Sequence, residues 1–594
     1  MSELQERSEP GTLRREVYLL LMIIAAGLIF GRIMSVDNVS DRAVQDLRLA
    51  RIPHELAIKQ QKLVKQGCQE EAIRQELRKT AKALLTDAKK ERPTLSANDR
   101  SRWLTIRALV EPESRTYRYV PVKAAGPVTT EQLRRNCGCS CPQQAVKGNL
   151  PEGRYVRQWV PYAIDKAMES SGWDTIDMVK HGLPDEEYSP ADPFSGYLYS
   201  SKPPLLPTLM AGPYWLLNRV CGLSLREQPY LTARILLVVY NLIPLVLAWY
   251  LLSIMIERLG RTNWGRIFAV AFLCFGTFLS TFSVTLNNHV PGVVSVVLAM
   301  YGAYVLLVCG DLRRRWFALT GFFGALAVAC ELPALAIAGV LCLTLLWKYP
   351  VRTLGTAIPC GLLVVAAFLG TNYLAHQTIV PAYAMKRDRV ERVGETAEQP
   401  TKTASLVSGP SYDANDWYIY RFFPGGRVRA AENARLSYWS NRVGIDRGEP
   451  SRWTYCLHAT VGHHGVFSLT PVWLLSMLGL LLWLVRGSRG QRGYAAIVLG
   501  LTLLFFVFYV SRGQDDRNYG GMTCGLRWFF PLVPLWIPAL LPVLDHMSRF
   551  RWERALALLL LFLSVMSVAY PVWNPWTHPW LYNGLISLGW IQHF

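Results

Sequence analysis

Long apolar runs separated by short polar segments make up most of this chain. A transmembrane helix needs roughly 20 consecutive apolar residues, and runs of about that length recur from residue 17 to the C-terminus. We predict about eleven transmembrane helices from these runs. They lie near residues 17–34, 231–256, 267–282, 291–309, 316–329, 332–347, 354–374, 469–485, 494–510, 528–543 and 556–570.

The first run could be mistaken for a cleaved signal peptide, because Arg14 and Arg15 precede it. No small-residue cleavage site occurs before Arg32. We therefore expect an uncleaved anchor over residues 17–34, with residues 1–16 in the cytoplasm.

Basic residues in alternate short loops give the orientation, since Lys and Arg are enriched on the cytoplasmic side. These residues are Arg258, Arg261, Arg266, Arg313, Arg314, Arg315, Lys348, Arg352, Arg486, Arg489, Arg492, Arg549, Arg551 and Arg554. All fall inside only if the short apolar segment 205–221, which contains Pro207 and Pro213, does not cross the membrane. We interpret this segment as an interfacial helix on the outer side.

This topology predicts an all-α polytopic membrane protein with a large first extracytoplasmic loop that carries interfacial helices. The long hydrophilic regions 35–204 and 375–468 lie outside. The second to seventh helices fall within 231–374 and the eighth to eleventh within 469–570. Residues 571–594 form an extracytoplasmic interfacial tail.

Composition agrees with a membrane protein: 51% of the 594 residues are hydrophobic and 20 are Trp. The net charge of +20 sits largely in the cytoplasmic loops, where it meets anionic lipid headgroups. No DNA- or RNA-binding motif occurs, so we expect membrane lipids and no nucleic acid as partners. The expected location is the cytoplasmic (inner) membrane.

The first outer loop opens with a charged stretch, 41–90, that predicts one or two solvated helices. After Pro93, Ser96 or Asn98 can cap a further helix whose first turn carries Asp99 and Arg102, three positions apart on one side. Asp99 has two interpretations, a charge that stabilises the helix dipole or a catalytic base.

Lys202 precedes Pro203 and Pro204 at the end of the same loop, just before the interfacial helix. A lysine at this depth either snorkels to the interface or binds an anionic headgroup. The joint presence of Asp99 and Lys202 in the loop after the first span favours the functional interpretation of both.

Two segments of this loop resemble motifs of the GT-C glycosyltransferases related to the lipid A aminoarabinose transferase and the protein O-mannosyltransferases. Residues 99–106, DRSRWLTI, resemble the D-E-x-R-Y motif, and residues 202–205, KPPL, resemble the K-P-P-L motif. The resemblance is best over 99–345. It implies a GT-C-like bundle in which Asp99 is the catalytic base and Lys202 and Arg102 attend the lipid phosphate.

The chain departs from that family where an acid is expected. Arg100 stands in place of the Glu after the motif Asp, and Ser201 replaces the acid that precedes K-P-P in some members. Those acids help to bind a divalent metal in some relatives. We therefore expect fixed cations to do this work, with no certain cofactor and no assigned metal ligand.

The chemistry can also be argued from the residues. Transfer of a sugar from a polyprenyl phosphate needs a base for the acceptor hydroxyl and positive charge at the departing phosphate. A single carboxylate favours an inverting displacement, since a retaining one needs a second carboxylate as nucleophile. Asp174 and Asp177 could face the acceptor or form a solvated helix face.

Further polar residues fall at the outer ends of predicted spans. His289 follows two asparagines and could bind phosphate, ligate a metal or form an interface hydrogen bond. Glu331 lies at the outer turn of a helix pair, where an acid is usually functional or paired. Arg527 ends a glycine-rich segment from Gly520 that resembles a G-G-x-x-x-G-P-R pattern of some multispan transferases, and it could reach a phosphate or sugar.

Clusters of Cys and His leave other options open. Cys137, Cys139 and Cys141 indicate a disulfide at least as much as a zinc site, with Cys68 or Cys456 as further partners. Three histidines, at 458, 463 and 464, have no acidic or Cys partner at a telling spacing. No Walker, G-x-S-x-G or dinucleotide motif occurs, so the energy has to arrive in the activated donor.

The sequence therefore predicts a membrane glycosyltransferase that moves a sugar from a polyprenyl-phosphate donor to a glycan, lipid or protein hydroxyl on the extracytoplasmic face. A lipid or small-molecule transporter or flippase is the main alternative. Against it, mid-span charges are few and polar residues gather at the outer ends. A non-catalytic GT-C-like assembly subunit is a third interpretation.

Overall fold

The computed structural model of the chain describes residues 9–38, 69–88, 91–121, 155–386, 413–423, 434–440 and 442–591, with isolated positions between 49 and 67. The predicted Cys137, Cys139 and Cys141 cluster and Cys68 lie outside the described residues.

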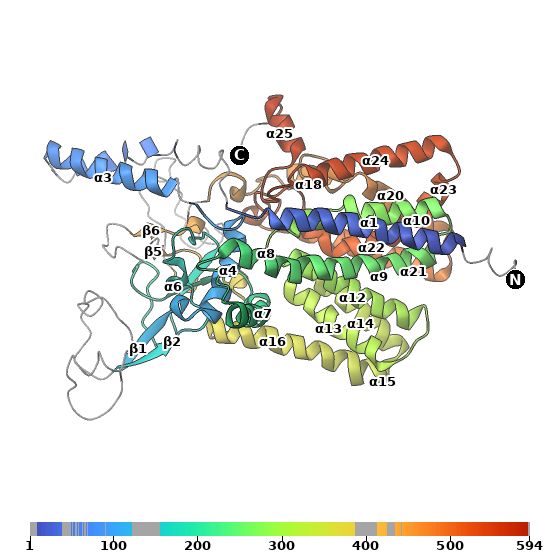
Figure 1. Ribbon diagram of the computed structural model, residues 1–594, viewed down its shortest axis with the longest axis horizontal. Coiled ribbons are helices and arrows are strands. Elements are labelled where there is room, and N and C mark those ends of the chain that lie inside the picture. Colours follow the sequence, from blue (N-terminus) through green and yellow to red (C-terminus); the bar gives the residue numbers. More distant parts are fainter. Residues whose placement is uncertain are drawn as a thin grey trace, which may run out of the picture.

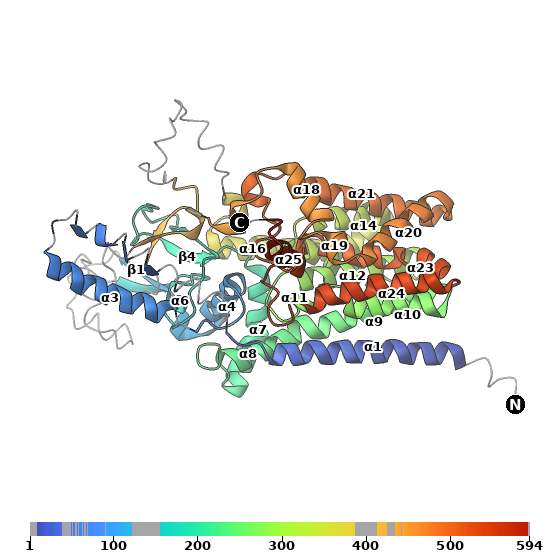
Figure 2. The ribbon, with the colours of Figure 1, turned by 90° about the horizontal axis from the view of Figure 1, so that it is seen from above.

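Long apolar helices lie side by side in a bundle (Figures 1 and 2). Each predicted span coincides with one of these helices or with a helix interrupted by a short break. The bundle is formed by α1 (Glu9–Met34), α8 (Pro229–Leu237), η3 (Val238–Leu242), α9 (Ile243–Leu259), α10 (Asn263–Phe275), α11 (Leu279–Phe282), α12 (His289–Leu307), α13 (Arg314–Cys330), α14 (Ala334–Lys348), α15 (Pro350–Arg352), η4 (Thr353–Ala357), α16 (Ile358–His376), α20 (Val472–Arg486), α21 (Arg489–Ser511), η11 (Arg527–Leu532), α22 (Val533–Ala539), α23 (Leu541–Met547) and α24 (Arg551–Ala569).

Seven helices of the described residues are long and apolar enough to cross a membrane. An eighth span results if the pair Arg527–Ala539 and Leu541–Met547, bent by 44°, is counted as one. The remaining predicted spans correspond to α13, α14 and α20, which are shorter helices of 15 to 17 residues. The structure thus establishes a polytopic helical bundle, whereas the full number of about eleven crossings remains a prediction.

Polar segments divide between the two ends of the bundle. In Figure 1 the start of α1 and the short basic loops near α15 and α23 lie at one end, and the described parts of both long hydrophilic regions lie at the other. Helix α7 (Leu205–Cys221) has the bounds predicted for the interfacial segment. It is viewed nearly end-on in Figure 1, across the direction of the bundle helices.

The long regions contain short strands as well as helices, a departure from the all-α prediction. Three two-stranded antiparallel sheets occur among the described residues. They form because each pair of strands is brought together by a loop, so that their backbone groups pair locally. The elements are α3 (Glu70–Ala88), α4 (Ala97–Val110), β1 (Tyr117–Pro121), β2 (Tyr155–Trp159), α6 (Asp165–Met168), β3 (Met178–His181), β4 (Tyr197–Ser200), β5 (Arg421–Phe422), β6 (Arg435–Leu436), α18 (Arg452–Thr460), α19 (Val466–Leu469) and α25 (Trp580–Ser587).

Close packing at small residues and an ion pair between Arg14 and Glu257 connect helices of the bundle. A Cβ on Gly321 would lie 1.9 Å from the Ala357 carbonyl oxygen, and one on Gly479 would lie 1.7 Å from the Ala539 carbonyl oxygen. Close backbone approach of this kind is a main source of helix association in lipid. At the basic end, Arg14 Nε donates to Glu257 Oε2 at 2.8 Å, which joins α1 to α9.

Candidate active site

Helix α4 places the first carboxylate of the site. Ser96 caps the helix, its hydroxyl accepting from the Asp99 backbone N–H at 3.0 Å, as one of the two predicted caps. The Asp99 carboxylate accepts from Leu95 N at 3.3 Å and from Leu286 N at 3.0 Å. It is 1% exposed, and burial raises its pKa.

The turn that presents Leu286 is itself held by a buried amide. Asn241 Nδ2 donates at 2.9 Å to the carbonyl oxygens of both Ser283 and Thr285. Asn241 lies in η3, a π-helical turn within the span Pro229–Leu259, and such turns are frequent at functional sites. We did not select Asn241 from the sequence, although an Asn inside an apolar run is a usable signal.

The β3–β4 hairpin brings Asp177 to Lys202. Met178 pairs with Ser200, so the residues just beyond this pair, at 177 and at 201–202, are adjacent. Lys202 Nζ lies 2.8 Å from Asp177 Oδ1, and Ser101 Oγ donates to the Asp177 carbonyl at 2.5 Å. Residues 174–177 are irregular rather than helical, so the interpretation of these acids as a solvated helix face is wrong.

In this part of the site, burial and ion pairing shift the pKa values of the charged groups in opposite directions. Burial alone would raise the pKa of Asp177, but Lys202 and Arg102 hold it below its usual range. Burial lowers the pKa of Lys202 despite its partner Asp177. The Lys202 side chain as a whole remains 21% exposed.

Asp174 lies elsewhere in the loop. Its carboxylate pairs with Arg92 Nε at 3.0 Å, and its carbonyl oxygen accepts from Arg100 Nε at 2.9 Å. Arg100, which stands at the Glu position of the D-E-x-R-Y motif that this segment resembles, thus binds loop backbone. The structure brings Asp177, and not Asp174, to the predicted phosphate-binding cations.

A chain of side-chain contacts continues from Arg102 into the bundle. Arg102 donates to the Asn98 carbonyl at 3.0 Å and to the Asn288 side-chain oxygen. Asn288 Nδ2 donates to Glu331 Oε1 at 2.7 Å. Burial, together with the cation of Arg527, lowers the pKa of Arg102 to about 10, while nearby carboxylates act in the opposite direction.

His289 joins Glu331 to Arg527. Its Nδ1 contacts Glu331 Oε1, and its Nε2 lies 2.6 Å from Arg527 Nη1. Guanidinium is always a donor, so Nε2 accepts and the ring proton sits on Nδ1, facing the Glu331 carboxylate. His289 is thereby occupied as a bridge between two charged groups.

The glycine-rich segment before Arg527 is shaped to receive that side chain. Gly520 and Gly521 have φ angles of 94° and 78°, which side-chain-bearing residues rarely adopt. Arg527 Nη2 donates to the Gly520 carbonyl at 2.7 Å, and its guanidinium stacks 4.7 Å from the Trp576 ring centroid.

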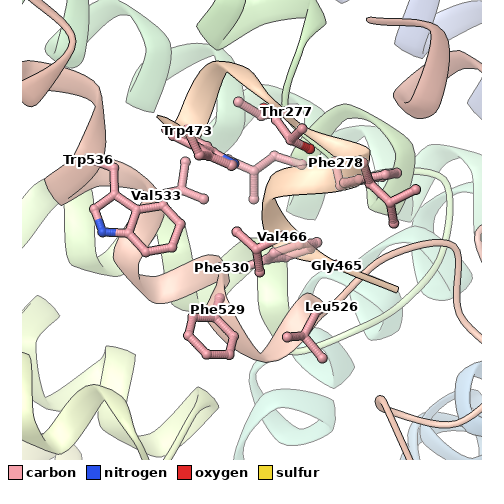
Figure 3. Close-up of a pocket in the computed structure, with 13 residues that line it drawn as sticks. Thr277, Phe278, Gly465, Val466, Trp473, Leu526, Phe529, Phe530, Val533 and Trp536 are labelled. Atoms are coloured by element: carbon pink, nitrogen blue, oxygen red, sulfur yellow. The ribbon is translucent and has the colours of Figure 1, made fainter. Parts of the chain in front are cut away.

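Behind this segment lies a small apolar cavity of about 30 Å³ (Figure 3). Leu526, Phe529, Phe530, Trp473 and Trp536 line it. Its size is close to that of one water molecule. The cavity is therefore a packing feature of the apolar core next to Leu526.

The structure thus gathers six of the predicted site residues at the polar end of the bundle. Hydrogen bonds, ion pairs or charge–charge interactions connect these residues, which are Arg102, Asp177, Lys202, His289, Glu331 and Arg527. Asp99 shares the first turn of α4 with Arg102. Arg234, in α8, donates to the Val36 carbonyl at 2.9 Å.

In the described part of the chain, no group of three or more His, Cys, Asp or Glu residues is arranged to hold an ion. His458 and His463 stack with centroids 3.9 Å apart. Cys456 forms no disulfide with any of the cysteines that the structure describes.

Comparison with known proteins gives only distant likenesses. No family model and no curated protein matches the chain. Among solved structures, the apo oligosaccharyltransferase of Archaeoglobus fulgidus is similar with a TM-score of 0.32 and 12% identity, over 66% of this chain and 49% of that one. The same enzyme, AglB, in complex with an inhibitory peptide and a dolichol-phosphate has a TM-score of 0.31 and 13% identity, over 66% and 50%. The chain spans about half the length of these structures.

Proposed function

We propose that this chain is a GT-C-type glycosyltransferase that uses a polyprenyl-phosphate-linked sugar at the extracytoplasmic face of the membrane. The observation that carries the proposal is the convergence of Lys202, Arg102 and Arg527 with Asp99 and Asp177 at one end of an apolar bundle. Cations for a phosphate beside carboxylates, at a membrane boundary, match the needs of this reaction.

The bond changes are those of a displacement at the anomeric carbon. The acceptor oxygen forms a bond to that carbon as the bond from the carbon to the phosphate oxygen breaks. The acceptor proton passes to Asp99, and the polyprenyl phosphate departs with the bonding electrons. Lys202, Arg102 and Arg527 stabilise the charge on the departing phosphate.

An apolar groove supplies a place for the lipid. A cavity of about 440 Å³ lies between α13, α14 and α16, lined by small and aliphatic residues such as Gly324, Ala325 and Leu335. Leu332, which immediately follows the site residue Glu331, lines its outer part. A polyprenyl chain in this groove would bring its phosphate toward the cation cluster, which consists of Lys202, Arg102 and Arg527.

The test uses the full-length protein in liposomes. A panel of polyprenyl phosphates carrying hexose, pentose or uronic acid is supplied with cell-envelope extracts as acceptors, and release of free polyprenyl phosphate is followed by ³¹P NMR. We expect release from at least one donor, dependent on acceptor. Transbilayer movement of a fluorescent polyprenyl phosphate without any release would favour the flippase interpretation and contradict the proposal.

A further inference from the structure

A carboxylate from the second hydrophilic region faces the cation cluster and has no role in the reaction described above. Asp446 lies in the 3-10 turn η9 (Gly444–Arg447). Its carboxylate is close enough to interact electrostatically with the Arg527 guanidinium and with the Asp177 carboxylate. A Cβ on Gly521, in the segment that presents Arg527, would lie 3.3 Å from Asp446 Oδ1.

Only neutral side chains hydrogen-bond to this carboxylate among the described residues. Tyr438 Oη donates to Asp446 Oδ2 at 2.8 Å, and Asn518 Nδ2 donates to Oδ1 at 3.1 Å. The nearby cation Arg442 is engaged by Asp515, with Nη1 and Oδ2 3.1 Å apart. A carboxylate offers about four acceptor positions, so roughly two are left for further donors.

These three side chains are partly rather than fully buried. Burial raises the pKa of Asp446, and the charge of Asp177 adds to the rise. A carboxylate in this setting gains from additional hydroxyl donors.

We propose that Asp446, with Tyr438 and Asn518, binds the hydroxyl groups of the donor sugar and selects neutral sugars over uronic acids. The inference rests on the proposed function. The sugar is bonded directly to the phosphate, so it must lie next to the cations that hold that phosphate. Asp446 accepts from sugar hydroxyls and Asn518 can also exchange hydrogen bonds with them, whereas a sugar carboxylate would be repelled by Asp446.

The test separates the sugar from the phosphate by binding measurements on the full-length protein. Bare C55 polyprenyl phosphate is compared with the same lipid phosphate carrying a neutral hexose, a neutral pentose or a uronic acid. We expect wild type to bind at least one neutral glycosyl phosphate more tightly than the bare phosphate. Asp446→Asn should remove about tenfold or more of that added affinity and leave binding of the bare phosphate within about twofold.

Two further variants test the role of Asp446, one by a smaller expected loss of affinity and one as a matched control. Tyr438→Phe removes one donor to Asp446 and should give a smaller loss of the same kind. Asp413→Asn is the matched control in the same hydrophilic region, because Asp413 accepts from Asn415 N at 2.9 Å and Asn can form the same turn. It should leave every affinity unchanged.

The outcomes distinguish the two proposals. If wild type binds bare polyprenyl phosphate but Asp446→Asn keeps the full preference for the neutral sugar, or lowers all affinities equally, the sugar-binding role is wrong. If wild type binds the uronic acid donor as tightly as the neutral ones, the selectivity is wrong. If wild type binds neither bare nor glycosylated phosphate, the proposed function itself fails and the inference falls with it.

Discussion

Asp99 is held by two backbone N–H groups, which fixes its carboxylate and limits what can replace it. Asp99→Asn should reduce transfer by roughly 10²–10⁴-fold, because an amide cannot take up the acceptor proton. One Asn nitrogen would also face a backbone N–H, so the free energy of unfolding should fall by about 1–3 kcal/mol. Donor turnover and binding of bare polyprenyl phosphate are measured on the same preparation. Near wild-type turnover would show that Asp99 is only a helix-end charge.

Lys202 is partly exposed, and among the described residues its ion-pair partner is Asp177. Lys202→Ala should weaken binding of polyprenyl phosphate roughly ten- to hundredfold, because a charge-assisted hydrogen bond worth about 1.5–3 kcal/mol is lost. Binding of the uncharged polyprenol should not change. Asp174→Asn is the matched control, since that carboxylate pairs with Arg92. Equal losses for the phosphate and the alcohol would show that Lys202 merely anchors the interface.

At the scale of elements, a buried ion pair connects the helix that carries Asp99 to α7. Arg107 Nε donates to Glu111 Oε2 at 2.9 Å, and Tyr214 of α7 donates to Glu111 Oε1 at 2.6 Å. Glu111→Ala leaves the buried guanidinium uncompensated, so it should destabilise the protein by about 3–5 kcal/mol. Thermal unfolding in detergent measures the loss. The double variant Arg107→Met, Glu111→Leu should recover much of it, and a single variant as stable as wild type would contradict this role.

Histidines connect three segments that lie between the long apolar helices in sequence, and they predict a pH dependence. His464 stacks on Tyr519 with centroids 4.8 Å apart and contacts His578 edge-on. Burial, reinforced by His458, lowers the pKa of His463 from 6.5 to about 3. The folded pKa lies below the unfolded one, so this contribution to stability is complete above about pH 6.5 and is lost as the pH falls toward 3.

Thermal unfolding of wild type should therefore occur at lower temperature at pH 5 than at pH 7.5. His463→Phe should show a shallower decline over that range, because one group that must stay neutral has been removed. His546→Phe serves as a control, since the His546 side chain is 60% exposed. An identical decline in wild type and His463→Phe would contradict the prediction.

For the whole molecule, the separation of basic loops from the long polar regions predicts which end faces outward. Glu187 lies in the first hydrophilic region and Arg489 at the start of α21, and both are exposed. The predicted topology puts them on opposite sides of the membrane. A cysteine at Glu187, in a background without native cysteines, should react with an impermeant maleimide in intact cells. A cysteine at Arg489 should react only after permeabilisation. The reverse pattern would overturn the orientation and place the site on the cytoplasmic side.

Much of the helical architecture followed from hydropathy, because in lipid the backbone must satisfy its own hydrogen bonds and helices do this locally. The segment 205–221 was predicted as a helix with the bounds of α7, and the cap at Ser96 was one of two predicted. The short sheets were missed because strand pairing depends on which loop segments meet. The total number of membrane crossings remains a prediction, because the helices α13, α14 and α20 are short.

The sequence by itself determined where the apolar helices lie and which residue types carry the chemistry: an acid near the start of one loop helix, a lysine before a double proline, and polar groups at span ends. Only the tertiary structure decided which of them meet. It paired Lys202 with Asp177 and Asp174 with Arg92, and it placed Asn241 behind Asp99 and Asp446 beside Arg527. The physical reason is that hydropathy acts along the chain, whereas ion pairs and hydrogen bonds between residues tens to hundreds of positions apart form only when packing brings their atoms within about 3 Å.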